Sequence, residues 1–308
     1  MNSKRIVIAG GSGFIGRALA QEFSAHQFAV VILTRTPRQR TDGIREAAWD
    51  GQHIGEWVQN LDGAEAVINL TGKNINCPQT PENVRAITAS RVDSVNAIAA
   101  ALQQVKIPPR VWVQASATGF YGDTGDHACN ENSPPGHNVL AEICRQWEAA
   151  FAVAKVPNTR KVTLRISFVL GRDGGALPVL SRLTRWFLGG AAGNGRQYIS
   201  WIHLADLVQM FVTSVQRENP KGTFNAVVPG AVTNAKFMRE LRRVLRRPWS
   251  PPAPEFAVRF GSWLMKSEPS LALVSQRCSP EKFLEVEFPF QFPQLRPALE
   301  NLCREEIR

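Results

Sequence analysis

The sequence predicts an α/β fold, a doubly wound parallel sheet of the Rossmann type joined to a smaller C-terminal α/β lobe. Apolar runs alternate with amphipathic segments up to about residue 166, and a glycine-rich turn directly follows the first apolar run. Beyond Leu170 this regularity ends, and proline and aromatic residues accumulate from about Pro229. Alternation of this kind is typical of parallel strands with crossover helices on both faces of the sheet.

The elements follow from the pattern in order. The first apolar run, residues 5–9, enters a turn that carries Gly10, Gly13 and Gly16, and an amphipathic run follows it. Later apolar runs predict buried strands, and longer periodic segments predict helices. We expect strands over 28–33, 65–70, 110–116 and 161–166, and helices over 81–102 and 139–154.

The break at Leu170 suggests two structural units. We expect a dinucleotide-binding domain over 1–170, to which residues 203–228 return. Residues 171–202 and 229–308 then form the smaller substrate-side lobe. With 308 residues and 44% apolar content the chain has ample material for such a core.

The glycine turn indicates a dinucleotide, because glycine lets backbone amides approach a pyrophosphate at a helix N-terminus. A glycine string alone is weak evidence, since glycines collect in any tight turn. The end of the next strand is more specific: Thr34 and Arg35 stand where an Asp or Glu would bind the ribose of NAD. A guanidinium at this point suits a 2′-phosphate, so the sequence predicts NADP(H). Arg38 and Arg40 are expected in a solvated loop. The turn supplies the candidate contacts Gly10, Ser12, Gly13, Phe14, Ile15 and Gly16.

Three further strand ends are expected beside the ligand, because open sheets of this class bind ligands beyond the carboxyl ends of their strands. The first carries Leu70, Thr71 and Gly72, and the second begins at Ala115. The third, which includes Val169, would border the nicotinamide.

Composition excludes several classes. No stretch approaches the roughly 18 apolar residues of a membrane span, and no leader precedes the first strand, so we expect a cytoplasmic protein without membrane contact. Five cysteines without a CxxC pair predict no metal site. The net charge of +10 sits largely in residues 236–247, a basic helix that we interpret as a solvated face and not as a nucleic-acid site.

Segments spread over nearly the whole chain form the pattern of a known family. They are 67–72, 90–91, 115–122, 164–165, 169–171, 173–177, 189–190, 193–197, 200–203, 224–226 with Pro229, and 276–277 with Pro280. With the glycine turn, they resemble the extended short-chain dehydrogenase/reductases, and more closely the atypical epimerase-like family that includes bacterial YfcH. The resemblance implies cofactor contacts at Thr34, Arg35, Leu70, Thr71, Arg91 and Val169. The chain departs from the family at 73–81 and at 261–263, so we expect the loop near the substrate to differ.

Arg91 also has a physical case. It lies on the long predicted helix after the Leu70–Gly72 strand end, where a cation would pair with a phosphate. The alternative is an ordinary surface arginine.

The catalytic pair of working short-chain reductases, Tyr-x-x-x-Lys, is missing. Neither tyrosine has a lysine four residues later, and Leu140 and Cys144 stand in the two places. Neither residue can supply the proton that accompanies hydride transfer. Ser116 and Thr118 remain candidates for orienting a substrate, and Tyr121 is a candidate acid or, alternatively, a packing residue.

Two functions therefore stay open. The first is an NADP(H)-dependent oxidoreductase or nucleotide-sugar epimerase of unusual mechanism, acting on a small-molecule substrate. The second is a non-catalytic NADP(H)-binding redox sensor or interaction protein. Pairing of the helices 81–102 and 139–154 across a homodimer interface is expected from the extended relatives.

Overall fold

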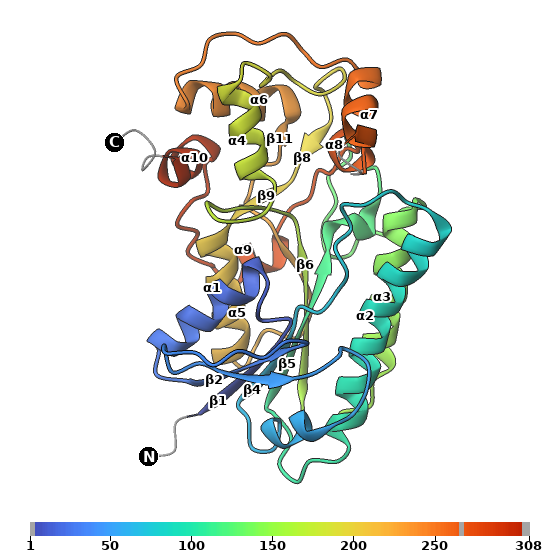
Figure 1. Cartoon of the computed structure of the whole chain (residues 1–308), viewed down its shortest axis with the longest axis vertical. Coiled ribbons are helices and arrows are strands. Elements are labelled where there is room, and N and C mark those ends of the chain that lie inside the picture. Colours follow the sequence, from blue (N-terminus) through green and yellow to red (C-terminus); the bar gives the residue numbers. More distant parts are fainter. Residues whose placement is uncertain (1–3, 265–267, 304–308) are drawn as a thin grey trace.

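The computed structural model describes residues 4–264 and 268–303, so residues 1–3, 265–267 and 304–308 of the predicted domain and lobe lie outside the described part. Within that part, seven parallel strands form one sheet in the order β10-β6-β5-β4-β1-β2-β3 (Figure 1). The predicted doubly wound α/β fold is therefore confirmed. The strands are β1 (Arg5–Ala9), β2 (Ala29–Thr34), β3 (Arg45–Ala48), β4 (Ala66–Asn69), β5 (Val111–Ala117), β6 (Arg160–Ile166) and β10 (Gly222–Ala226).

Helices cover both faces of the sheet, because successive strand residues point to opposite sides. Ile6 and Ile8 of β1 pack with α1 (Phe14–Ala25) and α5 (Leu204–Gln216). Val7 and Ala9 pack with α2 (Pro81–Leu102) and α3 (Val139–Val153) on the other face. The two layers are visible on opposite sides of the sheet in Figure 1. Because the seven strands are parallel, their carboxyl ends lie at the same edge of the sheet.

Two sheet strands do not stand out in the sequence. β3 reads Arg-Glu-Ala-Ala, is partly exposed and pairs only at the edge with β2. Four residues of this composition show no apolar run, so periodicity gives no signal. β10 follows α5 and pairs with β6 in parallel at the other edge of the sheet.

The remaining elements form a smaller lobe above the carboxyl ends of the strands (Figure 1). Here β7 pairs with β9, β8 pairs with β11, and α10 packs against α6. Among the described residues, no helix has the length and apolarity that crossing a membrane requires. The elements are β7 (Phe168–Leu170), α4 (Leu177–Arg185), β8 (Tyr198–Ile199), β9 (Trp201–His203), β11 (Val232–Thr233), α6 (Asn234–Val244), α7 (Glu255–Leu264), α8 (Ser270–Leu273), α9 (Glu281–Glu285) and α10 (Leu295–Cys303).

Candidate cofactor and active site

The glycine turn between β1 and α1 requires glycine at two positions for packing reasons. Gly10 has a φ of 73°, in the left-handed region that side chains avoid, and its N–H donates to the Leu33 carbonyl at 3.1 Å. A Cβ at Gly16 would lie 2.5 Å from the Cα of Gly11. These two glycines therefore let helix and strand approach each other closely.

Gly13 is different, because the protein leaves the space beside it open. An added Cβ would approach only the Gly10 carbonyl oxygen, at 3.4 Å. Gly13 is exposed and immediately precedes α1, whose described first turn holds no acidic residue and no side-chain cap. The amide groups at the start of this helix thus face a space that suits an anion. Ser12 is exposed beside Gly13, and Phe14 and Ile15 are half-buried.

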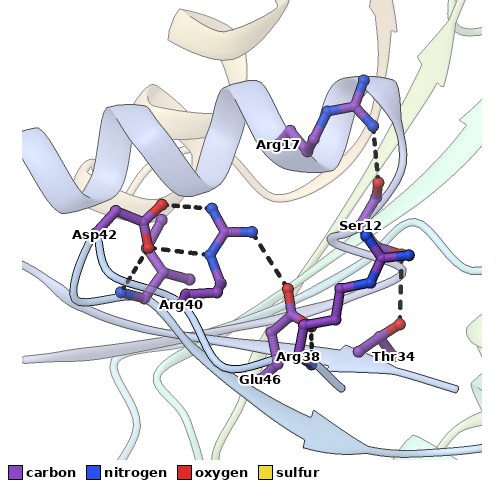
Figure 2. Close-up of polar contacts among 8 residues, drawn as sticks. Ser12, Arg17, Thr34, Arg38, Arg40, Asp42 and Glu46 are labelled. Carbon is purple, nitrogen blue, oxygen red and sulfur yellow. Dashed lines mark hydrogen bonds and ion pairs between the residues drawn. The ribbon is translucent and has the colours of Figure 1, made fainter. Parts of the chain in front are cut away.

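The end of β2 lies next to the glycine turn. The Thr34 hydroxyl donates to the Ser12 hydroxyl at 3.5 Å, and the exposed Arg35 follows directly. Arg40 is held by Asp42 and Glu46, as Figure 2 shows. Its guanidinium is therefore committed to the loop, as the sequence predicts, whereas Arg35 stays at the accessible strand end.

Figure 2 also shows the Arg38 side chain extending from this loop toward Ser12 and Thr34. The Arg38 backbone N–H donates to a Glu46 carboxylate oxygen at 2.8 Å, which holds the loop against β3. A second arginine is thus available near the strand end.

Thr71 follows β4 and carries a polar group with no protein partner. The buried Asn69 side chain donates to Ser94 and Gln114, and its oxygen accepts the Thr71 N–H at 3.0 Å. The Thr71 Oγ1 atom is itself buried, yet no described residue bonds to it. A buried polar atom without a partner is costly, so this hydroxyl indicates a missing ligand group. Leu70, one residue earlier, is half-buried and packs against both cores.

Gly72 makes room for Arg91, which was not its expected role. A Cβ on Gly72 would lie 3.0 Å from the Arg91 Cζ atom. Arg91 donates through Nη1 to the carbonyls of Lys73 and Ile87, both at 3.0 Å, and its Cζ atom lies 5.0 Å from the centre of the Trp147 ring. Burial lowers the pKa of Arg91. No carboxylate of the described residues pairs with this guanidinium, so a cation without a protein counter-ion stands at the strand end.

Phe14 connects the start of α1 to the end of β7. Added Cβ atoms at Gly171 and Gly174 would lie 2.2 and 2.4 Å from atoms of the Phe14 ring, so this loop passes directly over the ring. Val169 in β7 is half-buried, and its carbonyl lies 2.9 Å from the Cβ position of Gly175. The structure thereby brings Val169 and the glycine turn into one neighbourhood.

The end of β5 is occupied by an internal polar network. Ala115 and Ser116 are buried, and the Ser116 hydroxyl donates to Glu148 of α3 at 2.6 Å. The Arg165 guanidinium donates to both Glu148 carboxylate oxygens, at 2.9 and 2.8 Å. The Arg165 Cζ atom also lies 3.5 Å from the centre of the Phe120 ring. Ser116 is thus held by a buried ion pair.

Tyr121 belongs to the same network. It is 3% exposed, accepts a hydrogen bond from Arg165 at 2.9 Å and donates to Asn225 of β10 at 2.7 Å. Burial raises the pKa of Tyr121, and the nearby Arg165 charge opposes that rise only in part. Both hydrogen-bonding functions of this hydroxyl are therefore used within the protein. This environment suits a packing residue better than a proton donor.

Thr118 is also engaged. Its hydroxyl donates to the Gln276 side chain at 2.8 Å, which joins the turn after β5 to the smaller lobe. The residue is 2% exposed. All three candidate hydroxyls thus lie within one region, and each already has a protein partner.

The two missing catalytic positions lie beside this turn. An added Cβ at Gly119 would stand 3.6 Å from the Leu140 Cβ and 3.7 Å from the Cys144 Sγ. Burial raises the pKa of the Cys144 thiol to about 12, with the Glu148 charge acting in the same direction. Neither side chain can therefore act as a proton donor to a substrate at neutral pH.

The sequence does not predict which residues bond to the three candidate hydroxyls. The partners are Glu148, Asn225 and Gln276. A weak signal exists for Glu148, because it lies seven residues after Ala141 and four after Cys144, on the buried face of a helix. A carboxylate on such a face usually has a charged partner. Asn225 and Gln276 come from distant parts of the chain, and no local pattern indicates what they contact.

Comparison with known proteins identifies the family. The model of the NAD dependent epimerase/dehydratase family matches residues 6–226. The chain belongs to this family. A second model, a domain of unknown function (DUF1731), matches residues 253–302. The predicted resemblance is thereby confirmed.

The relatives cover almost the whole chain. The human epimerase family protein SDR39U1 is 30% identical over 306 residues, covering 97% of this chain and 99% of the relative. The Arabidopsis thaliana protein named "Epimerase family protein SDR39U1 homolog, chloroplastic" is 32% identical over 304 residues, covering 97% and 86%. A crystal structure of human SDR39U1 (isoform 2) with NADPH has a TM-score of 0.87 at 28% identity, covering 98% of this chain and 99% of that one.

Proposed function

We propose that the protein binds NADP(H) at the carboxyl ends of β1, β2 and β4. The observation that carries this proposal is the Arg91 guanidinium, which reaches the strand end and pairs with no carboxylate of the described residues. The partnerless Thr71 hydroxyl and the open space at Gly13 lie at ends of adjacent strands in the same sheet. The NADPH in the human relative's structure supports the same assignment.

Different residues suit different parts of the cofactor. The amides around Ser12–Gly16 suit the pyrophosphate. Thr71 follows β4, and Arg91 reaches the same strand end from α2, where a phosphate oxygen or a hydroxyl would satisfy both. Arg35, with Thr34 and Ser12, suits the 2′-phosphate. Bound NADPH would supply a hydride. Phe14 and Val169 would border the nicotinamide half.

Calorimetry of the purified chain with NADPH and NADH tests this assignment. We expect NADPH to bind clearly more tightly, because only NADPH carries the additional phosphate for Arg35. Equal affinities for the two nucleotides would contradict the NADP(H) assignment while leaving a dinucleotide site in place.

A separate question is whether the bound cofactor takes part in a reaction. The geometry favours binding of the nucleotide without the proton transfer that ordinary short-chain reductases perform. Ser116, Thr118 and Tyr121 are each hydrogen-bonded inside the protein, and Leu140 and Cys144 cannot replace the missing pair. General acid catalysis typically contributes about 10²–10⁴-fold, which this arrangement would forgo. We therefore propose a redox-sensing or interaction role, with an oxidoreductase or epimerase reaction as the second candidate.

Turnover separates the two candidates. The oxidoreductase or epimerase reaction is favoured by membership of an epimerase/dehydratase family, and it predicts oxidation of NADPH by some carbonyl compound or nucleotide sugar. A panel of such compounds, followed at the absorbance of NADPH, should show no turnover if the protein has the redox-sensing or interaction role. If turnover is found, Tyr121→Phe tests the phenol, because it keeps the ring and removes only the hydroxyl. The homodimer and the cytoplasmic location stay predictions.

A further inference from the structure

The end of the smaller lobe exposes large apolar side chains in two adjacent turns. The first turn follows α4 and the second follows α6. The exposed fractions are 74% for Trp186, 52% for Phe187, 65% for Leu188 and 74% for Trp249. A soluble monomer rarely groups side chains of this size on its surface without a use for them. We call these four residues, with Arg246 and Arg247, the aromatic tip.

The two turns lie side by side. The Arg247 Cζ atom stands 5.4 Å from the centre of the Phe187 ring, and Arg242 donates to the Gly189 carbonyl. Farther along, the Ala253 N–H donates to the Ala191 carbonyl at 2.8 Å. In Figure 1 the segment between α6 and α7, drawn in orange, crosses the end of the molecule opposite the sheet. The two turns that carry the aromatic tip therefore lie next to each other, in the part of the smaller lobe that is opposite the sheet (Figure 1).

Both turns use a backbone conformation that would favour glycine. Phe187 and Arg246 have φ values of 62° and 54°. After α4, the Phe187 and Leu188 N–H groups donate to Thr184 and Leu183. After α6, the corresponding donors are Arg246 and Arg247, to Arg243 and Arg242. This is the Schellman arrangement, whose left-handed position is usually occupied by glycine. The chain instead carries a phenylalanine and an arginine there, at a cost in stability, and directs both toward solvent.

Helix α7 extends the apolar surface. Phe256, Phe260 and Trp263 are 76%, 63% and 72% exposed, and their spacing of four and three residues places them on one face of the helix. The Phe260 and Trp263 ring centres are 5.9 Å apart. The helix begins two residues after Ala253, so this stripe continues from the aromatic tip.

The charge around the tip is strongly positive. Residues 239–247 contain five arginines and one acidic residue, Glu240. Glu240 is buried and pairs with Arg239, Arg243 and Arg296. Among the residues that the structure describes, no carboxylate pairs with Arg246 or Arg247. Their charge is thus available to an anionic partner.

We propose that the aromatic tip and α7 bind the surface of a membrane that contains anionic phospholipids. Tryptophan rings favour the headgroup level, phenylalanine and leucine can enter the acyl boundary, and arginine can pair with phosphate while its stem stays in apolar surroundings. A second copy of the chain fits less well, because facing tips would bring arginine clusters of like charge together. We expected no membrane contact because no described helix is long and apolar enough to span a membrane, but a lobe that binds at the surface needs no such helix.

The experiment measures co-sedimentation of the full chain with vesicles. Vesicles of phosphatidylcholine with phosphatidylglycerol should bind the chain, vesicles of phosphatidylcholine alone should bind it weakly, and added salt should weaken binding. Failure of the wild-type chain to bind the anionic vesicles at low salt would overturn the proposal.

Two variants test the tip without endangering the fold. Phe187→Gly and Arg246→Gly each place glycine at a left-handed position, so the thermal midpoint should stay the same or rise. Binding should nevertheless fall, by roughly tenfold for Phe187→Gly and about fivefold for Arg246→Gly. Ile107→Ser is the matched control, because Ile107 is 65% exposed but precedes β5 at the other end of the molecule.

Three results would contradict the proposal. The first is unchanged vesicle binding by Phe187→Gly and Arg246→Gly. The second is an equal loss with Ile107→Ser, which would show non-specific adhesion. The third is a wild-type dimer in light scattering that Phe187→Gly converts to a monomer, which would assign the surface to a second copy of the chain.

Discussion

Two strand-end regions of the same sheet differ in how their polar groups are satisfied. At the ends of β1 and β4, no described residue bonds to the Thr71 hydroxyl or offers a carboxylate to Arg91, and the space at Gly13 is open. At the ends of β5 and β6, Ser116 and Tyr121 are tied to Glu148, Arg165 and Asn225. We propose that the first region receives the nucleotide, whereas the polar groups of the second are satisfied by the protein itself.

The comparison shows that strand ends at the same edge of a sheet need not have the same chemistry. Parallel strands bring their carboxyl ends together in every sheet of this type, but function depends on which polar groups stay available there. We therefore expect substitutions in the first region to change ligand affinity. Substitutions in the second should change the free energy of unfolding.

The largest effect is expected for Glu148→Gln. Removing this charge leaves the buried Arg165 uncompensated, which should lower the free energy of unfolding by about 3–5 kcal/mol. Urea denaturation measures the change. The matched control is Glu142→Gln on the same helix, where the ion pair with Arg145 is exposed and the loss should be far smaller. Similar losses in the two variants would show that the buried network adds no more to stability than an exposed ion pair does.

Gly13→Val should affect the other region. The β-branched side chain would occupy the open space, so NADPH affinity should fall by at least about 100-fold, or ~2.7 kcal/mol. The backbone at Gly13 has φ −74° and ψ 177°, which any residue can adopt, so the fold should persist. Calorimetry and circular dichroism check the two parts. Unchanged affinity in a folded variant would place the nucleotide elsewhere.

Arg35→Ala should reduce the preference for NADPH over NADH by roughly 1–3 kcal/mol, the size of a charge-assisted contact to phosphate. NADH affinity should change little. Arg40→Ala is the comparison variant, because the Arg40 guanidinium already bonds to Asp42 and Glu46 and should contribute less. A larger loss of preference in Arg40→Ala would transfer the phosphate contact to that arginine.

A pair of hydroxyl deletions sharpens the comparison, and Thr71→Val has the smallest expected effect. Thr71→Val removes a buried hydroxyl that has no partner, so stability should be unchanged or higher. NADPH affinity should fall by about 0.5–1.5 kcal/mol, the contribution of one hydrogen bond. Isothermal titration and thermal denaturation give both values.

Tyr121→Phe should show the opposite pattern. It leaves Asn225 and one Arg165 donor without a partner, so the free energy of unfolding should fall by about 1–3 kcal/mol while NADPH affinity stays unchanged. If Thr71→Val lowered stability and Tyr121→Phe lowered affinity, the assignment of the two regions would be reversed.

Local patterns predict much of this molecule correctly. The helix Pro81–Leu102 has the predicted bounds, and α3 ends one residue before its predicted end. Apolar periodicity and capping residues lie next to one another in the chain, so these elements can be read directly. The edge strand β3 is the exception, because pairing with β2 and not its own sequence makes it a strand.

The candidate site divides in the same way. The strand–helix alternation, the glycine turn and Thr34 with Arg35 are local facts of the sequence, and they determined the fold class and the expected cofactor. The absence of Tyr-x-x-x-Lys is also a local fact, and it determined the expectation of unusual chemistry. Only the tertiary structure decided that Ser116, Thr118 and Tyr121 are occupied, because Glu148, Gln276 and Asn225 reach them from 32, 158 and 104 residues away. Whether a polar group is available to a ligand depends on partners that folding brings together, and no local pattern contains that information.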